Sequence, residues 1–158
     1  MNELTSYLAK GIIENEAVKK GTQVDVTSYR EVIELVIDNN NQSARGVIRI
    51  PNQYILTDII IIGYDGIGNL HGISFYPRDR FTVQFTGKNS QNKWSNMPED
   101  IALYALYANR PIIPELFTND KEIEIEIYHK ETTNKVELQD KIDFPAIFTV
   151  HIIGLKVR

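Results

Sequence analysis

The chain has 158 residues, of which 42% are hydrophobic and 24% are charged, a mixture typical of one globular domain. Its 17 basic and 21 acidic side chains give a formal charge of −4, so it lacks the basic surface that binding to phosphate backbones requires, and we expect no nucleic-acid partner. It contains no cysteine, which excludes disulfides, thiolate metal sites and cysteine nucleophiles.

Residues 1–20 are predicted to form an N-terminal helix or arm. Leu4, Leu8 and Ile12 recur at four-residue spacing with Tyr7 beside them, and on a helix these side chains form one apolar stripe. In one interpretation the helix packs on its own domain. In the other it docks on a neighbouring subunit, because a terminal segment is free to leave the core.

The remainder, residues 21–158, is predicted to be a single β-sandwich domain. Short β-rich segments alternate with turn residues, and no interval between them has the pattern of a crossover helix, so the strands are expected to be antiparallel. The expected strands are residues 30–37, 44–50, 54–63, 70–76, 80–86, 121–128 and 144–157. We therefore predict an all-β, jelly-roll-like fold with a short N-terminal helix or arm.

Two intervals leave the type of structure open. Residues 101–108 are compatible with a strand or with one helical turn. Residues 111–114 begin and end with proline, which enforces extended backbone, so an edge strand or a connector is expected there. The nearly all-apolar segment 54–63 is the best candidate for the middle of the core.

Residues 121–128 have the clearest strand pattern, because isoleucine and glutamate alternate along them. Glu122, Glu124 and Glu126 would form a regular row of carboxylates on one face, unlike a tuned acid–base pair. A solvated face is one interpretation. The functional alternatives are salt bridges with a basic neighbour, or protection of an edge strand against pairing with other chains.

Nothing in the sequence nominates catalytic chemistry. His71, His129 and His151 each stand alone, without a second ligand at metal-binding spacing. The glycines between residues 63 and 72 have neither the dinucleotide-binding nor the Walker spacing, and no Gly-x-Ser-x-Gly elbow occurs. We therefore expect no enzyme, no cofactor and no metal; a deep pocket gathering His71, Asp65 and glutamates would contradict that expectation.

Aromatic side chains and an arginine gather in residues 94–117, a combination that is common in protein contact patches. Ordinary anchoring of the core and loops is the alternative interpretation. With the N-terminal stripe, the predicted interface comprises Leu4, Tyr7, Leu8, Trp94, Tyr104, Tyr107, Arg110 and Phe117.

The second half, residues 75–158, resembles virion structural proteins of bacteriophages. The segments that carry the resemblance are residues 80–85 (RFTVQF), 93–96 (KWSN), 109–125 (NRPIIPELFTNDKEIEI) and 148–157 (FTVHIIGLKV). In such proteins a proline-rich entry, a polar turn, a strand and a final strand closing on a glycine build a jelly-roll-like sandwich in the shell or at the neck of the particle.

The resemblance implies a structural subunit that is used in many copies and performs no chemistry. Its expected partners are other copies of itself and other virion proteins, and its expected place is the virion, after assembly in the host cytoplasm. Capsid shell, decoration and head–tail connector positions all remain open. The alternative is a carbohydrate- or ligand-binding module that uses Trp94, Tyr104 and Tyr107 as a stacking surface.

The longest apolar run, Ile59 to Ile62, is far shorter than a membrane span, so we expect no transmembrane segment.

Overall fold

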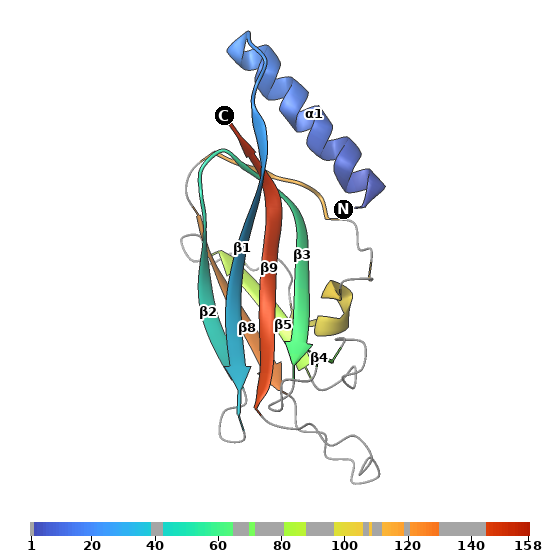
Figure 1. Ribbon diagram of the computed structural model, residues 1–158, viewed down its shortest axis with the longest axis vertical. Helices are drawn as coiled ribbons and strands as arrows, with labels where there is room; N and C mark the ends of the chain where they lie inside the picture. The colour runs from blue at the N-terminus through green and yellow to red at the C-terminus, as the bar shows by residue number, and fades with distance from the viewer. Residues whose placement is uncertain are drawn as a thin grey trace.

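The computed structural model is an antiparallel β-sandwich with one helix at its end (Figure 1), which confirms the predicted fold class. It describes residues 2–38, 43–64, 70–71, 81–87, 97–105, 108, 112–118, 121–129 and 145–158. All structural statements below refer to these residues.

The first sheet contains the long strands β1 (Val26–Ile37), β9 (Ala146–Val157) and β3 (Tyr54–Tyr64), in that order. Two short strands, β4 (Leu70–His71) and β7 (Leu116–Phe117), pair with opposite ends of the far edge of β3. The C-terminal strand β9 therefore lies in the centre, hydrogen-bonded to β1 on one side and to β3 on the other.

The second sheet has the order β2 (Ser43–Ile50), β8 (Lys121–His129), β5 (Phe81–Gly87) and β6 (Glu99–Asp100). The expected return strand at residues 44–50 is thus β2, which lies in the opposite sheet from β1 and pairs with β8. The segment at residues 101–108 that could have been strand or helical turn begins with a 3₁₀ turn, η2 (Ile101–Tyr104).

The connections between strands cross repeatedly from one sheet to the other. Leaving the two-residue β4 aside, the order β1-β9-β3-β7 faces the order β2-β8-β5-β6, so β1 and β2, β2 and β3, and β8 and β9 each lie in different sheets. This is the strand order of a jelly roll, the double-sheet arrangement used by viral shell proteins and lectins among others.

The inner faces of both sheets form one hydrophobic core. Ile123, Ile125 and Ile127 of β8 are at most 1% exposed, as their alternation with glutamate predicted. Across the core, Phe148 of β9 meets Phe81 of β5, and their rings pack edge-on with centroids 4.9 Å apart. The sandwich therefore depends on β-branched and aromatic burial.

A β-bulge explains why β3 is apolar without a clean alternation. The register to β9 shifts between Leu56 and Asp58, which leaves Thr57 as the extra residue. As a result Leu56 points into the core before the bulge, Ile59 points into it after the bulge, and Asp58 lies on the outer face with Ile153 of β9.

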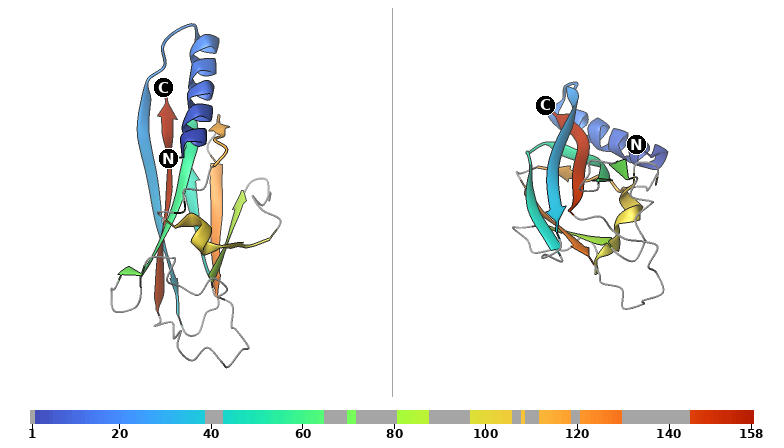
Figure 2. Two further views of the ribbon diagram at one scale, coloured as in Figure 1. Left: turned by 90° about the vertical axis from the view of Figure 1, so that its right-hand side faces the viewer. Right: turned by 60° about the horizontal axis from the view of Figure 1, so that its bottom comes forward.

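The helix α1 (Glu3–Lys20) begins at Asn2, whose side chain accepts a hydrogen bond from the backbone of Leu4, and ends at Gly21 with φ 65°. Its buried face differs from the predicted Leu4–Leu8–Ile12 stripe, because small side chains allow the helix to approach the sheet closely. The most deeply buried positions are Thr5 and Ala9. Ala9 packs in a small cluster with Val157, and the helix lies at one end of the sandwich (Figure 2).

Candidate interaction surfaces

The outward side of β1, β9 and β3 carries many apolar side chains, and we call it the β1–β9–β3 face. Val32 and Val36 of β1 are 50% and 46% exposed. No described helix or strand lies in front of the middle of β1 and β9 (Figure 1), because α1 reaches only the end of the sheet. The outward residues are Val26, Ser28, Arg30, Val32, Glu34 and Val36 on β1, Ile147, Thr149, His151 and Ile153 on β9, and Asp58, Ile60 and Ile62 on β3.

The strand register arranges these side chains in rows across the sheet. Val32 pairs with His151, which pairs in turn with Ile60, so one row has a valine, an imidazole and an isoleucine. The row of Arg30 continues through Ile153 to Asp58, and the row of Glu34 continues through Thr149 to Ile62. Charged groups therefore lie on either side of an apolar centre.

His151 holds Arg30 in place on this face. Arg30 Nε donates to His151 Nδ1 at 3.0 Å, and the neighbouring Nη2 also contacts Nδ1. Because arginine can only donate, Nδ1 must be unprotonated and the proton must reside on Nε2, 3.2 Å from Thr149 Oγ1. Burial, and secondly the positive charge of Arg30, lower the pKa of His151.

Glu34 has no such partner. Its side chain is exposed, and it makes no hydrogen bond or ion pair within the described part of the chain. Arg30, two positions before Val32, contacts a neutral imidazole instead of a carboxylate. The two outward charges of β1, Arg30 and Glu34, therefore form no ion pair with an opposite charge among the described residues.

The opposite side of the sandwich, the outward side of β2, β8 and β5, differs in charge pairing; we call it the β2–β8–β5 face. Arg45 of β2 forms ion pairs with Glu126 at 3.0 Å and Glu124 at 3.7 Å. Tyr128 also donates to Glu126, at 2.5 Å, and burial together with this hydrogen bond raises the pKa of Tyr128 to about 12. Two of the three glutamates in the row, Glu124 and Glu126, are therefore paired with a basic neighbour in the same chain.

This arrangement decides between two of the alternatives left open for that row. Strand β8 lies between β2 and β5, so its glutamates do not protect the edge of a sheet. Salt bridging with a basic neighbour is the arrangement found for Glu124 and Glu126.

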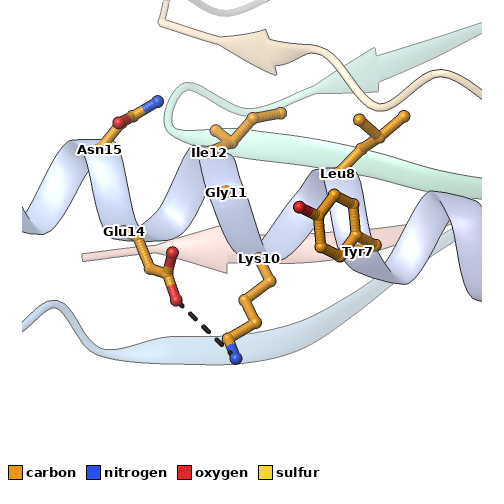
Figure 3. A pocket seen from close by; sticks show the side chains of 7 residues that line it. All are labelled: Tyr7, Leu8, Lys10, Gly11, Ile12, Glu14 and Asn15. Carbon is orange, nitrogen blue, oxygen red and sulfur yellow. Dashed lines mark ion pairs between the residues drawn. The ribbon is translucent and has the colours of Figure 1, made fainter.

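The outward side of α1 forms a second exposed surface. Leu4 is 54% and Tyr7 75% exposed, and the helix bears a hollow of about 350 Å³ beside Gly11. Figure 3 shows the side chains of Tyr7 and Leu8 on one side of Gly11. On another side, Lys10 forms an ion pair with Glu14 at 3.8 Å. A side chain at position 11 would meet nothing within 4 Å of its Cβ.

The structure separates the predicted interface residues into three groups. Leu4 and Tyr7 are exposed, and Leu8 is partly exposed. Tyr104 is only 6% exposed, with its ring centroid 5.2 Å from that of Phe85, and Phe117 is 3% exposed. These last two are core side chains, the alternative given for this cluster. The others, Trp94, Tyr107 and Arg110, lie outside the described residues.

The residues that could bind a metal or support catalysis do not converge in the described part of the chain. No group of three or more histidine, aspartate or glutamate side chains there could hold a metal ion. His151 contacts Arg30, and the ring of His129 lies 5.2 Å from that of Phe81. Asp65 and the side chain of His71 lie outside the described residues.

Sequence reasoning missed the β1–β9–β3 face. The signal was present in β1, where the outward Val32 and Val36 alternate with the inward Ile33 and Leu35, so that apolar side chains occur on both faces of the strand. Strands with apolar side chains on both faces are typical of sheets that are covered on both sides. The expected residues 30–37 included this signal, but without the register it did not distinguish the two faces.

Comparison with family models, with curated protein sequences and with solved structures gave no match for the chain. No helix in the described ranges is long and apolar enough to cross a membrane.

Proposed function

We propose that the chain is a structural subunit of a virus particle, acting as a capsid, decoration or head–tail connector component, and that it works through protein–protein assembly. Its work in this proposal is burial of surface against neighbouring subunits and involves no reaction. Other copies of itself and other virion proteins are the proposed partners.

The observation that carries the proposal is the uncovered apolar centre of the β1–β9–β3 face. Val32 and Val36 are about half exposed on a regular, rigid sheet, and Ile60, Ile62 and Ile147 are only partly buried beside them. Apolar surface that is clustered on one face, with charged residues beside it, is typical of a contact site for another macromolecule.

Two further points support a particle as the setting. The jelly-roll strand order is one that viral shell proteins use, although this is an analogy at the level of the fold. The segments at residues 80–85, 109–125 and 148–157 resemble bacteriophage virion structural proteins. Jelly rolls also serve as lectins, so the fold by itself favours neither assembly nor sugar binding.

The rival module would use aromatic rings as a stacking platform for sugars. Of its three proposed platform residues, Tyr104 is 6% exposed and its hydroxyl donates to Glu99, so its ring faces the core and not a ligand. This observation favours assembly over sugar binding.

Fractionation of virus particles tests the proposal. Particles are purified on a density gradient from cultures that carry the gene, and the chain is detected with an antibody. We expect the chain to sediment with intact particles and to remain after a high-salt wash. Particles that lack the chain would contradict the proposal, and specific binding of an oligosaccharide by the purified chain would then establish the rival module.

A further inference from the structure

We propose that the β1–β9–β3 face binds the same face of a second copy of this chain, with two-fold symmetry, and that Arg30 of each copy pairs with Glu34 of the other. This inference rests on the proposed function and names one of its contacts.

The order of charges on β1 makes the face complementary to itself. A two-fold axis that lies between two facing sheets and crosses the strands at Val32 places β1 over its copy in the opposite direction. Positions equally far before and after Val32 then face each other. Arg30 and Glu34 are two residues away on either side and have opposite charges, so each axis-related pair joins a cation to an anion.

The row at the axis fits this arrangement, whereas in the flanking rows Asp58 would face Ile62 of the second copy. The row at the axis contains Val32, His151 and Ile60, which would meet their own copies and form an apolar centre around the imidazoles. The charged pairs would lie on either side of this centre, where the surrounding apolar side chains reduce their contact with water. Pairs in such a position contribute more to specificity than fully exposed pairs do.

The state of the charges within one chain supports the pairing. Arg45 on the opposite face already contacts two carboxylates of its own chain. Arg30 is instead positioned by the neutral His151, and Glu34 has no partner in the described residues. The imidazole fixes the guanidinium beside Val32, so less side-chain freedom is lost when Glu34 of the second copy arrives.

The size of the contact sets its expected strength. The contact spans three strands that lie about 4.8 Å apart, and along each strand it covers about seven residues that rise about 3.3 Å each. Its footprint is therefore roughly 20 Å by 10 Å. A stable, isolated dimer buries about 800 Å² on each partner, so this contact is expected to be weak in solution. In a particle, many copies held in register would strengthen it through high effective concentration.

Charge reversal tests the inference, because two chains with opposite reversals restore the Arg–Glu pairs only if positions 30 and 34 face each other across the two-fold axis. Glu34→Arg and Arg30→Glu are made in separate chains, and self-association is measured by sedimentation velocity from about 10 μM to about 1 mM, a range that covers weak association. Each variant alone should associate at least about tenfold more weakly than the unmodified chain, since like charges then face each other. An equimolar mixture should associate at least as well as the unmodified chain, because every contact becomes an Arg–Glu pair.

Three outcomes are decisive. Association of Glu34→Arg equal to that of the unmodified chain, or a mixture no stronger than its components, would overturn the inference and leave the proposed function standing on other contacts. An unmodified chain that is monomeric at every concentration would also overturn it. Absence of the chain from purified particles is a separate readout that bears on the proposed function alone. Glu34→Arg keeps the test valid if Arg30→Glu fails to fold, because Glu34 makes no hydrogen bond or ion pair within the described residues.

Discussion

Both outer faces of the sandwich are formed by sheets of long strands, but the side chains on the two faces differ in their chemistry. On the β2–β8–β5 face, Arg45 pairs with Glu124 and Glu126 of β8 within the chain. On the β1–β9–β3 face, Val32 and Val36 are exposed, and Glu34 forms no ion pair with any described residue. The comparison shows that the two faces of one core differ in charge pairing and in exposed apolar surface. Under our proposal, the β1–β9–β3 face is the one that meets a partner.

Of the substitutions considered below, Gly154→Ala should lower the free energy of unfolding most, because it disturbs the packing of the core that both faces cover. A Cβ at Gly154 in the central strand β9 would lie 2.2 Å from the carbonyl oxygen of Ile55 and 2.4 Å from Tyr54 Cζ, and the backbone cannot yield without moving β3. We expect a loss of about 3 kcal/mol or more in the free energy of unfolding, measured by urea denaturation.

Gly11→Ala is the matched control for that substitution. Its Cβ meets nothing within 4 Å, and alanine favours the helix by about 0.5–1 kcal/mol. Equal stability of the two alanine variants would contradict the described packing of β9 against β3.

Thr5→Val should separate the helix from the end of the sandwich. Thr5 Oγ1 donates to the carbonyl of Ile112 at 2.8 Å and accepts from its N–H at 3.1 Å, and the side chain is fully buried. Valine has the same shape but satisfies neither group, so we expect a loss of about 1–3 kcal/mol in urea denaturation. Thr5→Ser retains the hydroxyl and should lose less; a larger loss for serine would contradict this explanation.

The stability of the folded chain should depend on pH through His151, which lies on the β1–β9–β3 face. The pKa of His151 is lower in the folded chain than its ordinary value of 6.5, so the folded state takes up its proton less readily than the unfolded state. The stabilisation from neutral His151 is therefore complete above pH 6.5 and is lost as the pH falls through the lower folded pKa. Urea denaturation between pH 7.5 and about 5 should show decreasing stability.

His151→Gln isolates this contribution from those of the other two histidines. The variant should show a shallower decline over the same pH range, because its side chain does not titrate. The same slope in both proteins would mean that burial and the charge of Arg30 do not lower the pKa of His151 in the folded chain.

Arg45→Gln should have the smallest effect. The Arg45 side chain is 59% exposed, and its ion pairs with Glu124 and Glu126 are accessible to salt. We expect a slight drop in the urea midpoint at low ionic strength that disappears in 0.5 M salt, a condition with a Debye length of only a few ångströms. A large drop that persists in salt would show that these pairs hold the sheet together.

The sequence predicted the fold well because hydrophobic alternation is a local signal. Ile123, Ile125 and Ile127 marked β8, and the expected strand at residues 144–157 is β9. The apolar stripe of α1 was predicted only in part. Ile12 packs against the cluster of Ala9 and Val157, whereas Leu4 is exposed and the most buried positions are the small Thr5 and Ala9.

The candidate site was harder to predict because it depends on register. Arg30, His151 and Asp58 are far apart in sequence, and a single bulge at Thr57 determines that Asp58 lies on the outer face. Tyr104 and Phe117 were chosen for their residue types, but residue type does not reveal whether a side chain faces the core or solvent. Only the pairing of β9 with both neighbours reveals the exposed face.

Matched substitutions on the two faces test the central claim most directly. Val32 and Val47 lie on β1 and β2 and are 50% and 40% exposed, so aspartate at either position should disturb the folded chain similarly. In sedimentation velocity we expect Val32→Asp to weaken self-association by at least about tenfold, because a charge then enters an apolar contact, while Val47→Asp associates like the unmodified chain. Equal association of the two variants would contradict the assignment of the β1–β9–β3 face as the contact surface.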